Sequence, residues 1–497
     1  MGFKEILQND RPGARASLLE DGNLLVYGLS SIFIALNLVL IANGFFWLSI
    51  LPLLVVIVLL LVFSLDKLLY LTVFLTPLSV NLGQAGFGTM VSLPVEPIMF
   101  AIMLVFLFKN LYRNTTDRHV YRHPMSILII INLIWIFMTS ITSELPLVSF
   151  KFLLSRLWFI VPFYFLSVQI FKNIRRIKSF LWCYMIPLSG VIIYSIYNLW
   201  AAGFDEQISQ DVMYPFYPSH TSYGAIIAMF IPFLLFTAVN VNGSYRLRVA
   251  GLCLFILFAV AILFSYSRAV WVSLPIAFAA YLAIRLRVRF GAIMICVAVV
   301  ASLLLTFQSD ILMQLERNKQ DSSEEFTENF QSISNISTDD SNTERLNRWS
   351  SAISMFVERP IFGWGPGTYQ FLYAPFQKSY NLTLISTNAG NRGNAHSEYI
   401  GPLAESGVLG SLSFIAIVLC SLFIGLRVIY RGEQRARWLA TTILLGLITY
   451  FVHAFLNNYL DTDKLSVPFW GFMAMLTALD LYETRREDAG LKELAAK

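Results

Sequence analysis

The sequence predicts an all-α polytopic membrane protein, a bundle of about 12–14 transmembrane helices with one large external loop that contains amphipathic helices. Of its 497 residues, 57% are hydrophobic and 13% are charged, and the mean hydropathy is +0.64. Such a composition is too apolar for a soluble globule. Apolar runs of roughly 15–22 residues recur along the chain, the length that a helix needs to cross about 30 Å of hydrocarbon.

Fourteen spans are predicted in this way, and the largest polar interruption between them divides the chain. The expected parts are an N-terminal transmembrane bundle of about 11 spans (1–307), a large external loop carrying the catalytic region (308–407), C-terminal transmembrane helices (408–482) and a cytoplasmic tail (483–497). The predicted spans are 24–41, 45–64, 68–82, 94–108, 125–141, 147–170, 177–200, 222–239, 249–264, 269–286, 290–307, 408–429, 438–455 and 465–481.

Basic residues predict the orientation, because Lys and Arg near the ends of spans are held on the cytoplasmic side. Every second connection is basic, and this set holds 25 of the 36 Lys and Arg residues. Both termini are therefore expected in the cytoplasm and the long loop outside. The net charge of +5 belongs mostly to this rim, which indicates anionic membrane lipids as partners, and no nucleic acid.

Cysteine usage excludes two further classes of site. All four cysteines lie inside predicted spans and the long loop has none, so a disulfide framework and a thiolate zinc site are not expected. They are Cys183, Cys253, Cys296 and Cys420.

The long loop divides into three parts by composition. Residues 317–344 are acidic and polar with little apolar periodicity, so we expect them to be mobile. From Glu344 the apolar residues fall at helical spacing until Pro360, which predicts an amphipathic helix on the bilayer or on the bundle. Residues 363–367 follow and are too rich in glycine for a helix or a strand. A tight turn with an aromatic anchor at the membrane interface would be enough to explain this composition. A polar loop then leads to His396 at the outer mouth of the next helix.

Three motif segments resemble the O-antigen ligase and polymerase family of bacterial membrane glycosyltransferases. They lie within roughly residues 255–430 and are Ser265-Tyr266-Ser267-Arg268-Ala269, Arg348-Trp349 with Arg359-Pro360-Ile361-Phe362-Gly363-Trp364-Gly365, and His396-Ser397 followed after nine residues by Gly407 and Gly410. The resemblance implies an undecaprenyl pyrophosphate-linked glycan as donor, a glycan or lipid A core as acceptor, and the bacterial inner membrane as location. It also implies no cofactor and no metal.

His396 is the predicted catalytic residue, because a neutral imidazole can take the proton of an acceptor hydroxyl at neutral pH. The structural alternative is that it caps the helix or pairs with Glu398 or Glu405. Ser397, Gly363, Gly365, Gly407 and Gly410 are expected to shape the motif.

Arginine is the predicted ligand of the pyrophosphate, since its planar fork binds phosphate in a bidentate manner. Arg268 and Arg156 lie in the external halves of spans, where charge is costly without a partner or cavity. For Arg156 and Lys151, snorkelling to outer headgroups is the alternative. Arg348 could clamp the donor, or lie with Arg345 on a solvated helix face.

Other polar residues are less specific. Asp461-Thr462-Asp463 has the spacing of a metal-binding carboxylate pair but is usually only a turn, and is left out of the predicted site. His220 is expected at the mouth of the eighth span, where it could line the acceptor path. His453 is expected to pack or form a hydrogen bond within the thirteenth span.

The predicted function is therefore an O-antigen ligase-like, inverting, metal-independent glycosyltransferase. An O-antigen or exopolysaccharide polymerase that uses the same donor is the alternative within the family. A transporter for lipid-linked oligosaccharides is the alternative from another class, but transporters usually show related halves and buried charges near the midplane of the bilayer. Neither feature is visible in the sequence.

Overall fold

A computed structural model describes residues 12–82, 91–113, 116–204, 206–209, 211–240, 243–288, 340–378 and 393–495, and in addition positions 291, 295 and 302. The chain divides into two units, Met1–Leu68 and Leu69–Lys497. Most of the predicted eleventh span, 290–307, and most of the acidic segment, 317–344, lie outside the described residues.

The first unit holds two apolar helices that correspond to the first two predicted spans. Their residues are apolar on all sides, which is typical of segments that are stable only in lipid or protein. The parts Val26–Ala42 and Trp47–Phe63 are shorter than the other candidate spans. The elements are α1 (Pro12–Ala42), a short 3₁₀ turn (Trp47–Ile50) and α2 (Leu51–Phe63).

Ten helices in the described part of the chain are long and apolar enough to cross a membrane, and all belong to the second unit. They confirm the predicted class, an all-α polytopic membrane protein, and match ten of the fourteen predicted spans. They are α4 (Val95–Arg113), α6 (Pro124–Ile141), α7 to α8 (Pro146–Ile170, with a π-helical turn at Val161–Leu166), α9 (Ile174–Ala201), α11 (His220–Val239), α12 (Tyr245–Leu263), α13 (Arg268–Arg285), α19 (Gly401–Arg431), α20 (Gln434–Leu456) and α21 (Asp463–Ala495).

The third predicted span, 68–82, is wrong. Helix α3 (Leu65–Leu75) ends before Thr76-Pro77, since proline disfavours helical geometry at the residue before it. A 3₁₀ turn (Thr76–Leu78) and an antiparallel pair of two-residue strands follow, β1 (Val80–Asn81) and β2 (Ser92–Leu93). The remaining short helices are α5 (Arg118–Arg122), α10 (Glu206–Ser209), α18 (Tyr369–Leu372) and a 3₁₀ turn (Ala374–Phe376).

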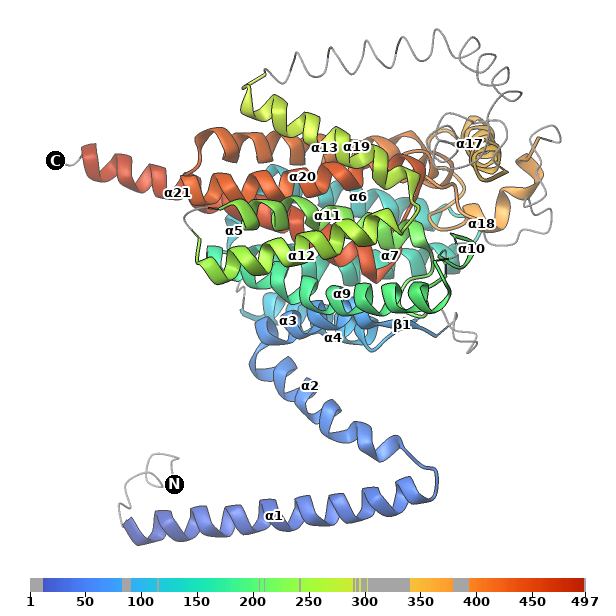
Figure 1. Cartoon of the computed structure of the whole chain (residues 1–497). Coiled ribbons are helices and arrows are strands. Elements are labelled where there is room, and N and C mark those ends of the chain that lie inside the picture. Colours follow the sequence, from blue (N-terminus) through green and yellow to red (C-terminus); the bar gives the residue numbers. More distant parts are fainter. Residues whose placement is uncertain are drawn as a thin grey trace. The chain divides into compact units, whose positions relative to one another are not determined.

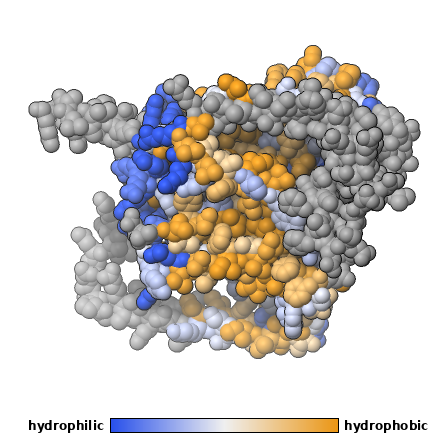
Figure 2. Space-filling model, turned by 45° about the horizontal axis from the view of Figure 1, so that its top comes forward, coloured by the Kyte–Doolittle hydropathy of each residue, from blue (hydrophilic) through white to orange (hydrophobic). Residues whose placement is uncertain are grey.

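The connections of the second unit gather at two ends of the bundle (Figure 1). Helices α17 (Asp340–Glu358), α18 and α10 and strand β1 lie at one end, here called the loop end. Helix α5 and the last part of α21 lie at the other end, here called the basic end. Figure 2 shows a broad apolar band with strongly hydrophilic residues along one side of it. The two sets of connections distinguished in the sequence thus lie at opposite ends.

Helices α21, α20 and α11 form the centre of the second unit. In the most apolar window of each, 89%, 78% and 72% of the residues are buried, against 22% in α12 and in α13. The three helices approach closely at Gly446 of α20, where a Cβ would stand 2.4 Å from the Met229 carbonyl oxygen and 2.9 Å from the Phe472 ring. The site described next is built on this rigid centre and on α7.

Candidate active site

The glycine turn and the start of α19 meet through their main chains. The Trp364 N–H donates to the carbonyl of Ala404 (2.9 Å), and the Val408 N–H donates to that of Pro360 (2.9 Å). The Trp364 indole N–H donates to the carbonyl of Met355 (3.0 Å), so this tryptophan anchors the turn to protein. The two segments therefore act as one rigid corner.

Gly363 and Gly407 are required by this corner. Their φ angles are +67° and +68°, and a Cβ would stand 2.4 Å from the Glu405 carbonyl carbon in one case and 2.0 Å from the Ile361 oxygen in the other. Helix α19 begins at Gly401 and breaks at Gly407 (ψ −169°), so the predicted start of this span at 408 is wrong. The motif glycines also include Gly365 (φ +117°) and Gly410, which packs on Ser406.

The amphipathic helix is confirmed as α17, and it packs on the bundle at α19. Its apolar face contributes Ala352 and Met355 to a buried cluster that includes Tyr373 and Ala395. This packing brings the polar face of α17 against the segment that carries His396.

Arg348 lies on that polar face, and the expectation that it is solvated is wrong. The residue is 5% exposed, its Nε pairs with Glu344, and its guanidinium lies 4.2 Å from the centre of the Tyr373 ring. Its Nη1 is buried without a hydrogen-bond partner among the described residues. The guanidinium lies against Gly393, where a Cβ would stand 1.5 Å from Nη1. Arg348 thus holds an unused donor next to the His396 segment.

His396 occupies a left-handed turn, with φ +47°, an uncommon conformation for this residue type that is often found at functional sites. Its N–H donates to Asn394 Oδ1 (3.0 Å). The residue that caps the following turn is Ser397, whose Oγ accepts from the N–H groups of Tyr399 and Ile400 (both 3.3 Å). Loss of hydration is the main cause that lowers the pKa of His396 to about 4. The positive charges of Arg345 and Arg348 lower this pKa further, and the negative charge of Glu344 acts in the opposite direction. The imidazole is therefore neutral at neutral pH.

Two more imidazoles share this neighbourhood. The Arg345 guanidinium is close enough to His220, His396 and His453 to act on the charge of all three. His453 is 1% exposed and forms a hydrogen bond with Asn457 (3.2 Å), as expected from its place in the span. Its Nε2 has no partner within the described chain.

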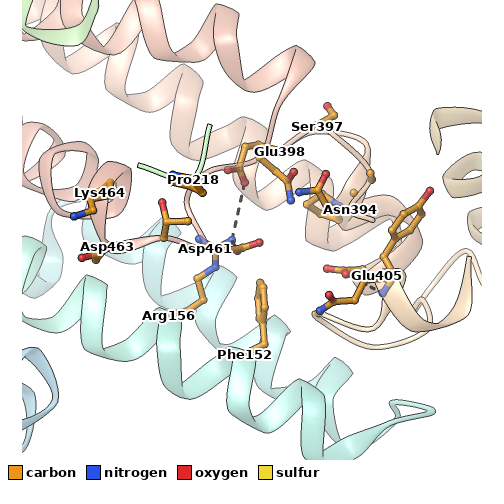
Figure 3. A pocket seen from close by; sticks show the side chains of 18 of the residues that line it. Phe152, Arg156, Pro218, Asn394, Ser397, Glu398, Glu405, Asp461, Asp463 and Lys464 are labelled. Atoms are coloured by element: carbon orange, nitrogen blue, oxygen red, sulfur yellow. Dashed lines mark hydrogen bonds and ion pairs between the residues drawn. The ribbon is translucent and has the colours of Figure 1, made fainter. Parts of the chain in front are cut away.

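A polar cavity of about 380 Å³ lies on the other side of the His396 segment. Asn394, Ala395, Ser397 and Glu398 line it, whereas His396 is not among the described residues that do. Figure 3 shows side chains from distant parts of the sequence pointing into this space. Five acidic and two basic residues line it: Glu96, Glu398, Glu405, Asp461, Asp463, Arg156 and Lys464.

Arg156 lies on the wall of the cavity and is 13% exposed. Its Nη1 donates to the Leu460 carbonyl (2.7 Å) and its Nη2 to Asp461 (2.8 Å), while Phe152 lies below the guanidinium, 4.8 Å away at its ring centre. Arg156 is therefore held by protein groups and does not extend to the outer headgroups, the alternative considered from the sequence. Lys151 is exposed and does not line the cavity in the described structure.

Glu398 points into the cavity toward Arg156 (Figure 3) and is 5% exposed. Its Oε1 accepts from the Tyr450 hydroxyl (3.1 Å) and the Leu460 N–H (2.8 Å), and its Oε2 is 4.0 Å from Arg156 Nη2. Burial raises the pKa of this carboxyl to about 7, although Arg156 acts in the opposite direction. Glu405 accepts instead from the Tyr369 N–H (3.1 Å). These contacts of the described residues do not include His396, so they give no support to the alternative that the imidazole pairs with Glu398 or Glu405.

The Asp461-Thr462-Asp463 turn, which the sequence analysis left out of the predicted site, lines this cavity. Asp461 pairs with Arg156, and Asp463 accepts from the Ser79 hydroxyl. The Lys464 ammonium donates to the carbonyls of Thr76 and Ser79 (both 2.6 Å). These contacts tie the start of α21 to the segment before β1.

Arg268 begins α13, two residues after Tyr266, which is also left-handed (φ +47°). Arg268 is not among the described residues that line the cavity. Ser267, the residue before Arg268, packs against Gly224 of α11, where a Cβ added to the glycine would stand 3.2 Å from the Ser267 Cβ. Gly224 lies about one turn after His220, the first residue of α11. The structure thus places Arg268 near the start of α11.

A smaller cavity of about 50 Å³ lies deeper in the bundle and shares Arg156, Glu398 and Glu405 with the first. Apolar residues of α6, α7 and α19 line much of it, among them Ile136 and Phe414. The polar chamber thus borders an apolar space.

Residues 252–415 match the family model Wzy_C, described as O-Antigen ligase. The matched region contains Arg268, α17, the glycine turn and His396 through Gly410, so it confirms the resemblance seen in the motifs. No match is found among curated proteins. The fold and this match define a multi-pass membrane protein with a region similar to O-antigen ligases.

Proposed function

We propose that the protein is an O-antigen ligase-like glycosyltransferase that moves a glycan from undecaprenyl pyrophosphate to an acceptor hydroxyl of lipid A core or a similar glycan. The observation that carries the proposal is the neutral, half-buried imidazole of His396 beside the unused donor of Arg348, inside the matched region. The loop end would face the periplasm of a bacterial inner membrane, with both termini in the cytoplasm.

In the proposed inverting step, the acceptor oxygen attacks the anomeric carbon. Its proton passes to an imidazole nitrogen of His396 as the bond between that carbon and the pyrophosphate oxygen breaks. The electron pair leaves on the pyrophosphate. Loss of hydration, together with the charges of Arg345 and Arg348, keeps the pKa of the free imidazole low and the ring unprotonated. A bound pyrophosphate would offset these two positive charges and make His396 more basic when the donor is present.

The pyrophosphate would be held by arginine. Arg348 supports this role best, because its Nη1 has no partner among the described residues and it lies at the His396 segment. A second proposed ligand is Arg268, supported by its place in a motif of the matched region and by its position at the start of α13. The other two predicted ligands are not proposed here, because Arg156 is engaged by the Leu460 carbonyl and Asp461 on the cavity wall and Lys151 lies on the exposed face of α7. We propose no metal or other cofactor for this step.

Replacement of single residues in cells tests the proposal. In a bacterial host without its own copy of the gene, His396→Ala and Arg268→Ala should abolish surface glycan at normal protein levels. His119→Ala is the matched control, because its side chain is 65% exposed near α5 at the basic end. Surface glycan that persists in both site variants would contradict the assigned roles.

The same cells separate the two activities of the family. Loss of a ligase leaves long unattached chains, whereas loss of a polymerase leaves single repeat units on the acceptor. We favour the ligase, because the His-Ser and Gly-x-x-Gly spacing is the one associated with that branch.

A further inference from the structure

The polar cavity beside His396 has the wrong charge for a pyrophosphate. Its five carboxylic acids outnumber its two basic residues, and Arg156 and Lys464 are already engaged by protein oxygens. Asp461 and Asp463 alone balance the charges of Arg156 and Lys464, so an anion placed here would find no net positive charge to offset its loss of hydration. The cavity therefore suits a ligand without negative charge.

Two acceptor oxygens of cavity-lining residues make no hydrogen bond within the described part of the chain. Glu398 is more than nine-tenths buried, and its Oε2 faces the cavity, 4.0 Å from Arg156 Nη2 and beyond hydrogen-bond distance. Asn458 also lines the cavity, and its Oδ1 has no hydrogen-bond partner among the described residues. A buried acceptor without a donor is costly, so a ligand that supplies O–H groups would be stabilised here.

The remaining walls add flat apolar surface to these polar groups. Phe152, Phe216 and Tyr369 line the same cavity, and its volume of about 380 Å³ lies within the range of small-ligand sites, about 300–1,000 Å³. A sugar ring carries hydroxyl donors and acceptors around its edge and C–H groups on its faces. It would therefore match a lining of polar groups and aromatic rings.

We propose that this cavity is a binding subsite for an uncharged sugar ring of the glycan substrate, with Glu398 Oε2 and Asn458 Oδ1 as acceptors of its hydroxyls. The subsite rests on the proposed glycosyl transfer and adds to it. Segment 394–398 carries His396 toward α17 and Glu398 toward the cavity. A sugar held in the cavity would thus position the glycan chain relative to the imidazole.

Ligand binding without turnover tests this proposal. The purified full-length protein in lipid nanodiscs is examined by saturation-transfer NMR with methyl glycosides of glucose, galactose, rhamnose and N-acetylglucosamine, and separately with glucuronic acid and inorganic pyrophosphate. At least one neutral glycoside should bind. Glu398→Gln and Asn458→Leu should each weaken that binding about two- to tenfold, the effect of one hydrogen bond.

The control is Glu358→Gln, which changes an exposed acid at the end of α17 and should bind as the wild type does. Asn458→Leu guards against misfolding, because the Oδ1 that it removes has no partner in the described protein. The proposal is overturned if no neutral glycoside binds, if both cavity variants bind normally, or if pyrophosphate or glucuronic acid binds instead in a manner that needs Glu398.

The outcome is separable from that of the proposed function. His396→Ala should bind the glycoside normally while losing transfer. Normal binding in folded cavity variants, together with loss of transfer in His396→Ala, would reject the subsite alone. Weakened binding in cavity variants, together with normal transfer in His396→Ala, would reject the role of the imidazole alone.

Discussion

Replacing Gly407 by alanine tests the corner that holds the site. Gly407 has φ +68°, and an alanine in left-handed geometry costs about 1–2 kcal/mol. Its Cβ would also stand 2.0 Å from the Ile361 carbonyl oxygen, so the glycine turn has to move away. That movement breaks the hydrogen bond from the Val408 N–H to Pro360, worth about 0.5–1.5 kcal/mol. The two effects together amount to about 1.5–3.5 kcal/mol.

The assay is thermal unfolding of the purified variant in detergent, followed by size-exclusion chromatography of the heated samples. Gly407→Ala should lower the midpoint by about 1–4 °C, since the unfolding entropy of a chain of 497 residues is large. The matched control is Gly190→Ala, an exposed glycine within α9 whose Cβ would have nothing within 4 Å. It should unfold at or slightly above the wild-type temperature, because alanine is the better helix former. Equal midpoints for Gly407→Ala and the wild type would refute the argument that this main-chain contact requires glycine.

Three further predictions concern the ionisable groups. The pKa of Glu398 is raised from 4.5 to about 7, so the buried carboxyl lowers stability as pH rises through that interval; Glu398→Gln should reduce this loss when thermal midpoints at pH 5 and pH 8 are compared. The pKa of His396 is lowered to about 4, so its imidazole ¹⁵N signals, assigned by their absence in His396→Ala, should still be those of the neutral form at pH 5.5. Arg348→Ala breaks the buried ion pair with Glu344 and should cost about 3–5 kcal/mol in thermal unfolding, whereas Arg359→Ala, whose side chain is 37% exposed, should cost at most about 1 kcal/mol.

The membrane fold could be predicted because the length of an apolar run has a direct physical meaning in a bilayer. The prediction failed at 68–82, where an apolar run is used for packing inside the protein, with Leu69 and Val73 fully buried. It also misplaced the start of α19, since the polar residues 401–407 do not look like the beginning of a membrane helix.

The motif half of the site could also be predicted, because His396, Gly363 and Gly407 stand at recognisable spacing. The position of Arg348 could not, since an amphipathic pattern shows which residues share a face but not whether that face meets water or protein. The cavity was missed for a related reason. Arg156, Glu398 and Asp461 come from α7, the loop before α19 and the loop before α21, and only the tertiary packing brings them together.

Glycosyl transfer by the purified protein tests the central claim most directly. The protein in liposomes is given undecaprenyl pyrophosphate-linked glycan with either lipid A core or a second lipid-linked glycan as acceptor, with and without EDTA. The wild type and His119→Ala should transfer glycan to one of these acceptors at a rate that EDTA leaves unchanged, and His396→Ala should be slower by about 10²–10⁴-fold. Wild-type rates from folded His396→Ala, or no transfer to either acceptor by the wild type, would contradict the account.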